Sequence, residues 1–218
     1  LIEMMVGRKL EEQYPRLDLP RGEKRLDVSH LSGPGVEDVS FTLYRGEILG
    51  VAGLMGAGRT ELMKILYGAA PRKAGTVSLD GRDVVTHSPQ DGLANGIVYI
   101  SEDRKRDGIV TARTVAENIN ISCRRNHLSL GLFIDDAREN RTAEEYVKKL
   151  GIKTPTTRQD IGALSGGNQQ KTILSRWLAE EGVRVIIMDE PTRGIDVGAK
   201  SEIYSVIYDL AAKGCAIV

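Results

Sequence analysis

The sequence predicts an α/β fold with an N-terminal antiparallel β part, a mostly parallel core sheet and a helical subdomain. Segments that alternate apolar and polar residues come first, at 25–28 and 39–43, as expected of half-buried strands. Continuous apolar runs follow at 97–100 and 185–188, and such runs are typical of strands that a parallel sheet buries on both faces. We therefore expect an antiparallel sheet first and a buried sheet after it.

Helical spacing between these strands is the second sign of the α/β class. Apolar residues recur at helical spacing in 60–66, the segment 135–150 is amphipathic, and short apolar runs indicate further strands. We expect helices at 60–66, 135–150, 168–180 and 197–212, a buried strand at 47–52, and another strand with its turn at 75–81.

The chain is expected to hold a linker and one domain. Residues 1–24 are polar and interrupted by prolines, without a sustained apolar period, so we interpret them as a linker from something upstream. The domain would then cover 25–218, with its helical subdomain at about 111–165. Residues 214–218 look like the start of a strand, and we expect the natural polypeptide to continue past them.

The composition is ordinary for a soluble globular protein, with 218 residues, 41% of them hydrophobic and 28% charged. Thirty basic and thirty acidic residues give a formal net charge of zero, which argues against nucleic acid as a partner. The apolar runs fall well short of the ~18 residues that span a membrane, so any membrane role would come through a partner. Cys123 and Cys215 fit no metal or redox spacing, and we expect small buried or half-buried residues in a reducing cytoplasm.

A glycine-rich turn at 53–60 is a candidate phosphate-binding loop. Its sequence is GLMGAGRT, with Gly53 and Gly58 at both glycine positions of the pattern G-x-x-x-x-G-K-[ST]. A strand that feeds such a turn into a helix aims backbone N–H groups and the positive end of the helix dipole at a phosphate. Thr60 can offer its hydroxyl to magnesium. Taken alone, the turn also fits a dinucleotide loop or a plain structural turn.

The loop departs from the pattern at one position, where Arg59 replaces the lysine. Arginine keeps the positive charge, but it is longer, planar and forked, and the exchange is not conservative in a tight loop. We therefore expect a loop that descends from a nucleotide site but binds phosphate more weakly.

Two acids follow the second buried run, where Asp189 and Glu190 close the segment VIIMDE. At the carboxyl end of a parallel strand, Asp189 would lie beside the phosphate loop and hold magnesium directly or through water. Glu190 would then orient or deprotonate an attacking water. The alternative is that these acids cap a helix or lie in a loop without a catalytic role.

A second turn of the anion-binding type lies at 164–171, with the sequence LSGGNQQK. Ser165, Gly166 and Gly167 offer a hydroxyl and two unobstructed amides at the start of a helix. The alternative is a simple helix start, because serine is a good N-cap. Two phosphate-type turns in one chain suggest two nucleotides, or one nucleotide shared between two copies.

Together these motifs resemble the ATP-binding subunit of bacterial ABC sugar importers. The segments that carry the resemblance are 164–171, 189–200 (DEPTRGIDVGAK) and 99–105 (YISEDRK). They are most similar to the second of two fused cassettes in the ribose type, whereas 111–183 looks nearer to arabinose-type relatives. The resemblance covers nearly the whole chain and implies a P-loop NTPase fold of the ABC type.

In that family two cassettes face each other head to tail, and ATP with Mg²⁺ binds between the phosphate loop of one and the Ser-Gly-Gly turn of the other. The resemblance therefore implies that Glu190 is the general base and that Asp196 lies on the dimer seam. The nucleotide-binding residues would be Gly53, Gly56, Ala57, Gly58, Arg59, Thr60 and Glu61, and the metal-binding residues would be Thr60, Asp189 and Glu102. The signature residues, which act in trans, would be Leu164, Ser165, Gly166, Gly167, Asn168 and Gln169.

Three positions depart from the family. Glu102 stands where most cassettes carry a glutamine that touches magnesium, so it keeps an oxygen ligand and adds a negative charge. Arg59 replaces the lysine of the phosphate loop. The turn at 32–36 shows no aromatic residue to stack on adenine, and His30 is expected at the surface.

The resemblance also implies the partners and the location. The partners would be a second cassette (the N-terminal cassette of the same subunit or a separate one), a transmembrane sugar permease and, indirectly, a periplasmic sugar-binding protein, with no nucleic acid. The chain would lie at the cytoplasmic face of the bacterial inner membrane as a peripheral protein.

Two functions fit these features. The first is an ATPase cassette that couples ATP binding and hydrolysis to uptake of a pentose such as ribose, with Glu190 as general base. The second is a degenerate, non-hydrolysing regulatory cassette that completes the partner's ATP site in trans. A DNA-repair or chromosome-type ATPase is disfavoured because the sequence lacks sustained heptads, and a dinucleotide dehydrogenase would explain neither the Ser-Gly-Gly turn nor the acid pair.

Overall fold

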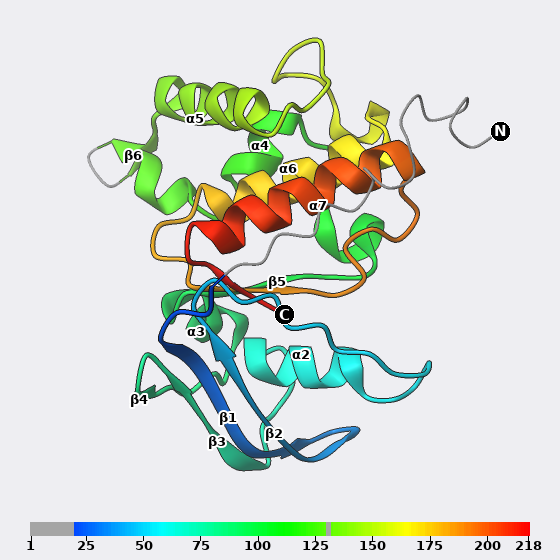
Figure 1. The fold of residues 1–218 in the computed structure, drawn as a ribbon. Helices are drawn as coiled ribbons and strands as arrows, with labels where there is room; N and C mark the ends of the chain where they lie inside the picture. The colour runs from blue at the N-terminus through cyan, green and yellow to red at the C-terminus, as the bar shows by residue number, and fades with distance from the viewer. Residues whose placement is uncertain (1–19, 130–131) are drawn as a thin grey trace, which may run out of the picture. The chain divides into compact units, whose positions relative to one another are not determined.

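The computed structural model describes residues 20–129 and 132–218, and most of the predicted linker lies outside them. The described residues form two compact units (Figure 1). The strand unit comprises 20–99, 182–189 and 207–218, and the helical unit comprises 100–129, 132–181 and 190–206.

The strand unit begins with the expected antiparallel sheet. Its order is β2-β1-β3-β4, and Figure 1 shows β1 and β2 in blue beside β3. Val28 of β1 pairs with Phe41 of β2 on one side and with Val77 of β3 on the other. Both alternating segments are thus confirmed as parts of longer strands. The strands are β1 (Lys24–Gly33), β2 (Val36–Tyr44), β3 (Ala74–Leu79) and β4 (Arg82–Asp83).

A second sheet contains the continuous apolar runs, with the strand order β5-β8-β9. Its strands are β5 (Ile97–Ile100), β8 (Val185–Met188) and β9 (Ala216–Ile217), and β8 pairs with β9 in parallel. The predictions of strands at 97–100 and 185–188 and of a strand start at 214–218 are therefore confirmed.

The predicted buried strand at 47–52 is wrong for most of its length. Within the described chain this segment has a single β-bridge, from Ile48 to Ile217, and Ile48 and Val51 are 38% and 37% exposed. After this bridge the chain continues into the glycine-rich turn.

Two helices belong to the strand unit. They are α2 (Arg59–Tyr67) and α3 (Pro89–Ala94), and α2 is the helix expected at 60–66. Leu62, Met63, Ile65 and Leu66 of α2 join the buried cluster formed by the sheets, because their spacing puts them on one face. The helix ends at Gly68, whose φ of 88° is the left-handed C-terminal conformation that glycine adopts at little cost.

The helical unit contains the other predicted helices. Its elements are η2 (Arg104–Gly108), α4 (Val115–Asn120), η3 (Arg124–His127), α5 (Asp136–Lys149), η4 (Ile161–Ala163), α6 (Gly166–Leu178) and the first ten residues of α7 (Val197–Ala212). A hairpin of β6 (Leu128–Ser129) and β7 (Phe133–Ile134) was not predicted. The domain limits of the sequence analysis, including the subdomain at 111–165, stay predictions.

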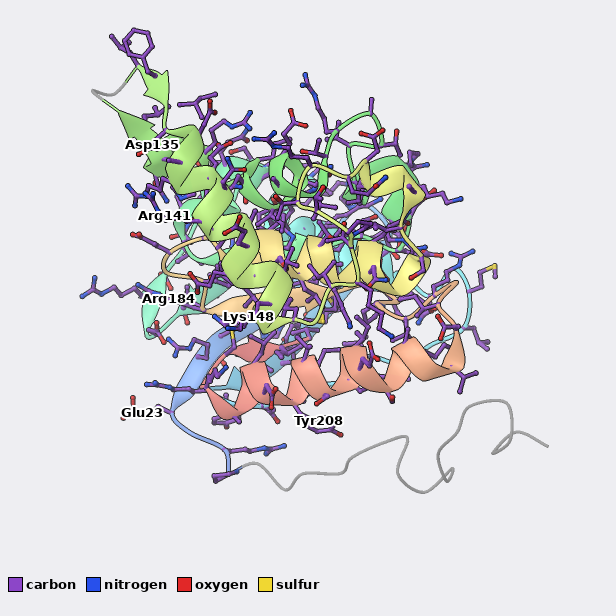
Figure 2. All side chains as sticks on the ribbon, turned by 90° about the horizontal axis from the view of Figure 1, so that it is seen from above. Glu23, Asp135, Arg141, Lys148, Arg184 and Tyr208 are labelled. Carbon is purple, nitrogen blue, oxygen red and sulfur yellow. The ribbon has the colours of Figure 1, made fainter. Side chains whose placement is uncertain are left out.

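The ends of α4 and α5 follow elementary helix chemistry. Thr114 and Glu117 form a capping box at the start of α4, and the hydrogen bond from the Thr114 amide is the main reason that the pKa of Glu117 is lowered. Helix α5 has Asp135 as its N-cap and lysines in its last turn, which suits the helix dipole. Figure 2 shows Asp135, Arg141 and Lys148 in this order along α5.

The two cysteines are buried and half-buried, as expected. Burial raises the pKa of Cys123 and of Cys215 to about 11, so both thiols stay protonated near neutral pH. Among the described residues, no helix is long and apolar enough to cross a membrane.

Candidate functional site

The glycine-rich turn at 53–60 leads directly into α2, as a phosphate loop requires. Gly58 is the N-cap of α2 with a φ of 81°, and a Cβ there would lie 2.5 Å from the carbonyl oxygen of Gly35. Gly56 also has a φ of 81°. Both positions need glycine for the left-handed backbone, and Gly58 needs it for space as well. Leu54 and Met55, at the tip, are 86% and 99% exposed.

Arg59 turns back along this loop. A Cβ on Gly53 would lie 3.6 Å from Cδ of Arg59 and 3.7 Å from its Cγ. The aliphatic part of the side chain therefore lies against the first glycine of the loop. Its guanidinium group supplies a positive charge at the position where the usual pattern has lysine.

Asp189 and Thr60 meet in the strand unit. Asp189 follows β8 and is 8% exposed, and its Oδ2 accepts a hydrogen bond of 2.7 Å from the Thr60 hydroxyl. The expectation that Asp189 lies beside the loop is confirmed. The two residues place a hydroxyl and a carboxylate oxygen together, which are the hard oxygen ligands that Mg²⁺ prefers.

Sequence reasoning gave Tyr99 no role in this site. Its hydroxyl donates a 3.0 Å hydrogen bond to the same oxygen of Asp189, and its ring lies 5.7 Å from that of Tyr67. The sequence signal was weak but present, since Tyr99 is the one polar-tipped residue in the apolar run 97–100.

The donor set also fits a metal held mainly by its substrate. In the described ranges 20–129 and 132–218, no three His, Cys, Asp or Glu residues cluster in a way that could hold a metal ion. Mg²⁺ commonly uses one or two protein oxygens together with substrate phosphates, rather than a cage of side chains. Thr60 and Asp189 match that mode of binding.

Glu102 belongs to the helical unit, whereas Thr60 and Asp189 belong to the strand unit. Its carboxylate forms an ion pair with Arg193. The added negative charge that distinguishes Glu102 from a glutamine is therefore opposed by a neighbouring guanidinium within the same unit.

Glu190 has an unusual backbone. Its φ is 49°, a left-handed conformation that residues other than glycine adopt rarely, and a proline follows it. The carbonyl of Glu190 accepts a hydrogen bond of 3.0 Å from the amide of Arg193, which closes the turn. The residue is exposed. Backbone strain of this kind costs about 1–3 kcal/mol and clusters at functional sites.

The Ser-Gly-Gly turn forms the start of α6, with Ser165 at the N-cap position. Within the described chain, the Ser165 side chain caps no backbone amide; its Oγ accepts a 3.0 Å hydrogen bond from Nδ2 of Asn168. Oδ1 of Asn168 in turn accepts from the Lys153 amide at 2.9 Å. The simple N-cap alternative is therefore not what this serine does.

Both glycines of this turn have close neighbours. A Cβ on Gly167 would lie 2.6 Å from the Cβ of Ala199 in α7. A Cβ on Gly166 would lie 2.9 Å from Nη2 of Arg104 and 3.1 Å from the carbonyl oxygen of Gly194. Because these two residues have no side chain, α7 and Arg104 can pack closely against the turn.

The turn opens on a hollow of about 200 Å³ in the helical unit. Asp196 lines it and also caps α7, because its Oδ1 accepts a hydrogen bond of 2.9 Å from the Ala199 amide. The other lining residues are Lys153, Ser165, Gly167, Asn168, Gly198, Ala199 and Glu202.

Other predicted site residues have clear structural contacts. Gln169 is buried at 5% exposure, and Leu164 packs on the cluster of Val115 and Ile119. Glu61 is exposed and lies close to Gly35 at the turn between β1 and β2. His30 is exposed, as expected, and its Nδ1 pairs with Asp38 at 2.6 Å.

The comparison with known families decides the identity. Residues 36–193 match the ABC transporter family, which is well over half of the 218 residues. The chain belongs to the ABC transporter family. It is an ATP-binding cassette, and the match contains the phosphate loop, Asp189 and the Ser-Gly-Gly turn.

Solved ABC transporter structures share the fold at low sequence identity. MJ1267, an ATP-binding cassette of an ABC transporter, has a TM-score of 0.75 at 22% identity, covering 89% of this chain and 80% of that one. The ADP conformation of the same cassette gives 0.70 at 20%, covering 89% and 79%. An ATP-binding subunit of an ABC transporter gives 0.66 at 23%, covering 88% and 77%. The ABC-type P-loop NTPase fold is thus confirmed.

Proposed function

We propose that this ABC cassette binds ATP with Mg²⁺ at residues 53–60 and presents the signature turn, residues 164–169, to nucleotide held by a second cassette. The observation that carries the first part is the 2.7 Å hydrogen bond from Thr60 to Asp189. It joins the end of the phosphate loop to the acid at the end of β8, although 129 positions separate them in the sequence.

The phosphate loop would act through its backbone. Amides at the start of α2, the helix dipole and the charge of Arg59 attract phosphate oxygens, and Gly58 lets the backbone approach closely. Thr60 and Asp189 would hold Mg²⁺, which when bound neutralises charge on the β- and γ-phosphate oxygens. Tyr99, by donating to Asp189, would keep that carboxylate oriented.

Glu190 is the proposed general base. A carboxylate directly after the metal-holding acid can accept a proton from the water that attacks the γ-phosphate. Its strained backbone fixes the direction in which the chain leaves β8. This function needs the two cassettes to come together, because the signature turn acts on the partner's nucleotide.

The proposed transport role is import of a pentose such as ribose, with this chain as the second of two fused cassettes. The support is the resemblance of 164–171, 189–200 and 99–105 to that subunit. The partners would be the first cassette, a transmembrane permease and, indirectly, a periplasmic sugar-binding protein. The chain would then lie as a peripheral protein at the cytoplasmic face of the inner membrane. ATP-dependent uptake of labelled ribose, compared with a hexose, in vesicles that contain the complete transporter tests this assignment.

A second function is favoured by one observation. Arg59 occupies the lysine position and its methylenes lie against Gly53, so less room remains beside the phosphates. The cassette would then bind nucleotide weakly without hydrolysis, while its signature turn completes the partner's site.

Removing the Thr60 hydroxyl tests the proposed metal site. Thr60→Val keeps the shape but loses the oxygen, so affinity for ATP in the presence of Mg²⁺ should fall about tenfold, while affinity for ATP without Mg²⁺ changes little. Thr76→Val, at an exposed position of β3, is the matched control. Equal affinity of the Thr60→Val variant and the wild type for Mg²⁺-ATP would contradict the assignment.

A further inference from the structure

A π-helical turn follows Glu102 directly. In η2 the amide of Ile109 donates to the carbonyl of Arg104 at 2.9 Å, five residues back, and Asp103 caps the turn by accepting from the Arg106 amide at 3.1 Å. π-Helical turns are rare and occur often at functional sites. Here the turn lies between a predicted nucleotide-site residue and the rest of the helical unit.

Residues on one face of α6 form hydrogen bonds with both ends of η2. Nε of Arg104 donates to Oε1 of Gln169 at 3.1 Å, and Nη1 of Arg176 donates to the carbonyl of Gly108 at 2.7 Å. Between these two contacts, a Cβ on Gly108 would lie 2.8 Å from Cδ1 of Ile173. Gln169, Ile173 and Arg176 are spaced i, i+4 and i+7, so they form one stripe along α6.

Gln169 connects Arg104 to the signature turn. Its Nε2 donates to the carbonyl of Ile161 at 3.2 Å and to the carbonyl of Leu164 at 3.1 Å. These two carbonyls belong to the backbone that enters the turn. The buried amide is thus bonded at both ends, to Arg104 on one side and to the backbone before Ser165 on the other.

Arg104 also packs on the turn itself. Its Nη2 lies 2.9 Å from the place where a Cβ of Gly166 would be, so the absence of a side chain at Gly166 admits the guanidinium. Arg104 is half-buried, and burial lowers the pKa of its guanidinium from the ordinary value. Arginine is not deprotonated in proteins, so the group keeps its positive charge.

We propose that Arg104 is a positioning residue that fixes the signature turn against the segment carrying Glu102. Arg104 itself need not touch nucleotide. It holds Gln169, and thereby Leu164 and the amides of Gly166 and Gly167, in the geometry that the partner cassette's nucleotide requires. This proposal rests on the proposed shared ATP site.

The test uses the complete two-cassette subunit and compares Arg104→Met with Arg106→Met. Methionine keeps much of the aliphatic length and loses every hydrogen bond; Arg106, in the same turn, is exposed and pairs with Asp107. We expect Arg104→Met to lower kcat about tenfold, with the affinity of this cassette's own phosphate loop for ATP unchanged, and Arg106→Met to lower neither. A kcat for Arg104→Met equal to that of the control overturns the proposal.

A double-mutant cycle separates positioning from a general loss of structure. If Arg104 acts through Gln169, the loss of kcat in the double variant of Arg104→Met and Gln169→Met should be smaller than the product of the two single losses, whereas losses that multiply would overturn the proposal. Arg104→Lys, measured against Arg106→Lys, keeps the charge and should recover part of the lost kcat. If Arg104→Met fails to fold, the Arg104→Lys variant supplies the test instead. Hydrogen exchange of the Gly166 and Gly167 amides should then be faster in Arg104→Lys than in Arg106→Lys. Equal exchange in the two lysine variants would contradict the proposal. A wild-type subunit without ATP turnover would contradict the shared site itself.

Discussion

The phosphate loop and the signature turn use the same device, glycines at the start of a helix, but they need glycine for different reasons. In the loop, Gly56 and Gly58 have φ of 81°, a conformation that other residues adopt at a cost. In the turn, Gly166 and Gly167 leave room for Arg104 and Ala199. Glycine is thus needed for its backbone conformation in the loop and for the space that it leaves in the turn. We therefore expect the two sites to respond differently when a glycine is replaced.

Gly58→Ala should give the largest loss of stability in the loop. It combines a φ of 81° with a contact of 2.5 Å to the Gly35 carbonyl, so we expect a loss of about 3 kcal/mol in the free energy of unfolding. Gly56→Ala has the same φ, and no atom of the described residues lies within 4 Å of its Cβ, so it should cost only about 1–2 kcal/mol. Urea unfolding of both variants measures the difference, and equal losses would show that the contact with Gly35 is unimportant.

Ser165→Arg tests the turn without touching the loop. A bulky cation in place of the exposed hydroxyl should obstruct the partner's nucleotide, and ATP turnover of the complete two-cassette subunit should fall at least about tenfold. Ser205→Arg, on the exposed face of α7, is the control. Full turnover in the Ser165→Arg subunit would rule out a shared site that uses this turn.

Arg59→Lys tests whether the loop is weakened by its arginine. Lysine presents a compact ammonium group and frees the space over Gly53, so affinity for Mg²⁺-ATP should rise, by about fivefold. Arg82→Lys, at an exposed position of β4, is the control for a simple exchange of cations. An unchanged affinity would place the weakness elsewhere, in the adenine contacts for example.

The smallest effect is expected at the capping box of α4, which belongs to neither nucleotide turn. The folded-state pKa of Glu117 is lowered, so the stability that its charge adds is present above the unfolded-state pKa and is lost as pH falls through the folded-state pKa. Glu117→Gln should therefore be less stable than the wild type by about 0.5 kcal/mol at pH 7, and the gap should close as pH falls below about 4. Urea unfolding at both pH values measures it; a gap that is unchanged at low pH would mean that the charge has no part in the cap.

Local patterns predicted the elements that have a strong period. Helix α7 and strand β8 have the predicted bounds. Both could be predicted because the spacing of apolar residues along the sequence is different in a helix and in a short buried strand. The segment 47–52 was not predicted correctly, because an apolar run records neither the neighbours that would bury it nor the strands that would pair with it; among the described residues it forms one β-bridge, at Ile48.

The candidate site was predictable where a motif encodes it. The sequence alone placed Asp189 beside the phosphate loop, since ligands of a parallel sheet bind at the carboxyl ends of its strands, and the hydrogen bond from Thr60 to Asp189 agrees. Tyr99 and Arg104 were not given roles, because a side-chain hydrogen bond across 65 or 90 positions leaves no local pattern. Gln169 was assigned to the signature set, and it also bonds the backbone that enters the turn, at the carbonyls of Ile161 and Leu164.

The central claim is that the loop at 53–60, with Asp189 beside it, is a working ATP–Mg²⁺ site. A calorimetric titration of this chain with ATP, with and without Mg²⁺, tests it most directly once circular dichroism has shown that the chain is folded. The account predicts a dissociation constant on the order of micromolar with Mg²⁺ and clearly weaker binding without it. A folded chain that takes up no ATP, or that binds it equally well without Mg²⁺, would contradict the claim and leave the signature turn as the part of this cassette that serves catalysis.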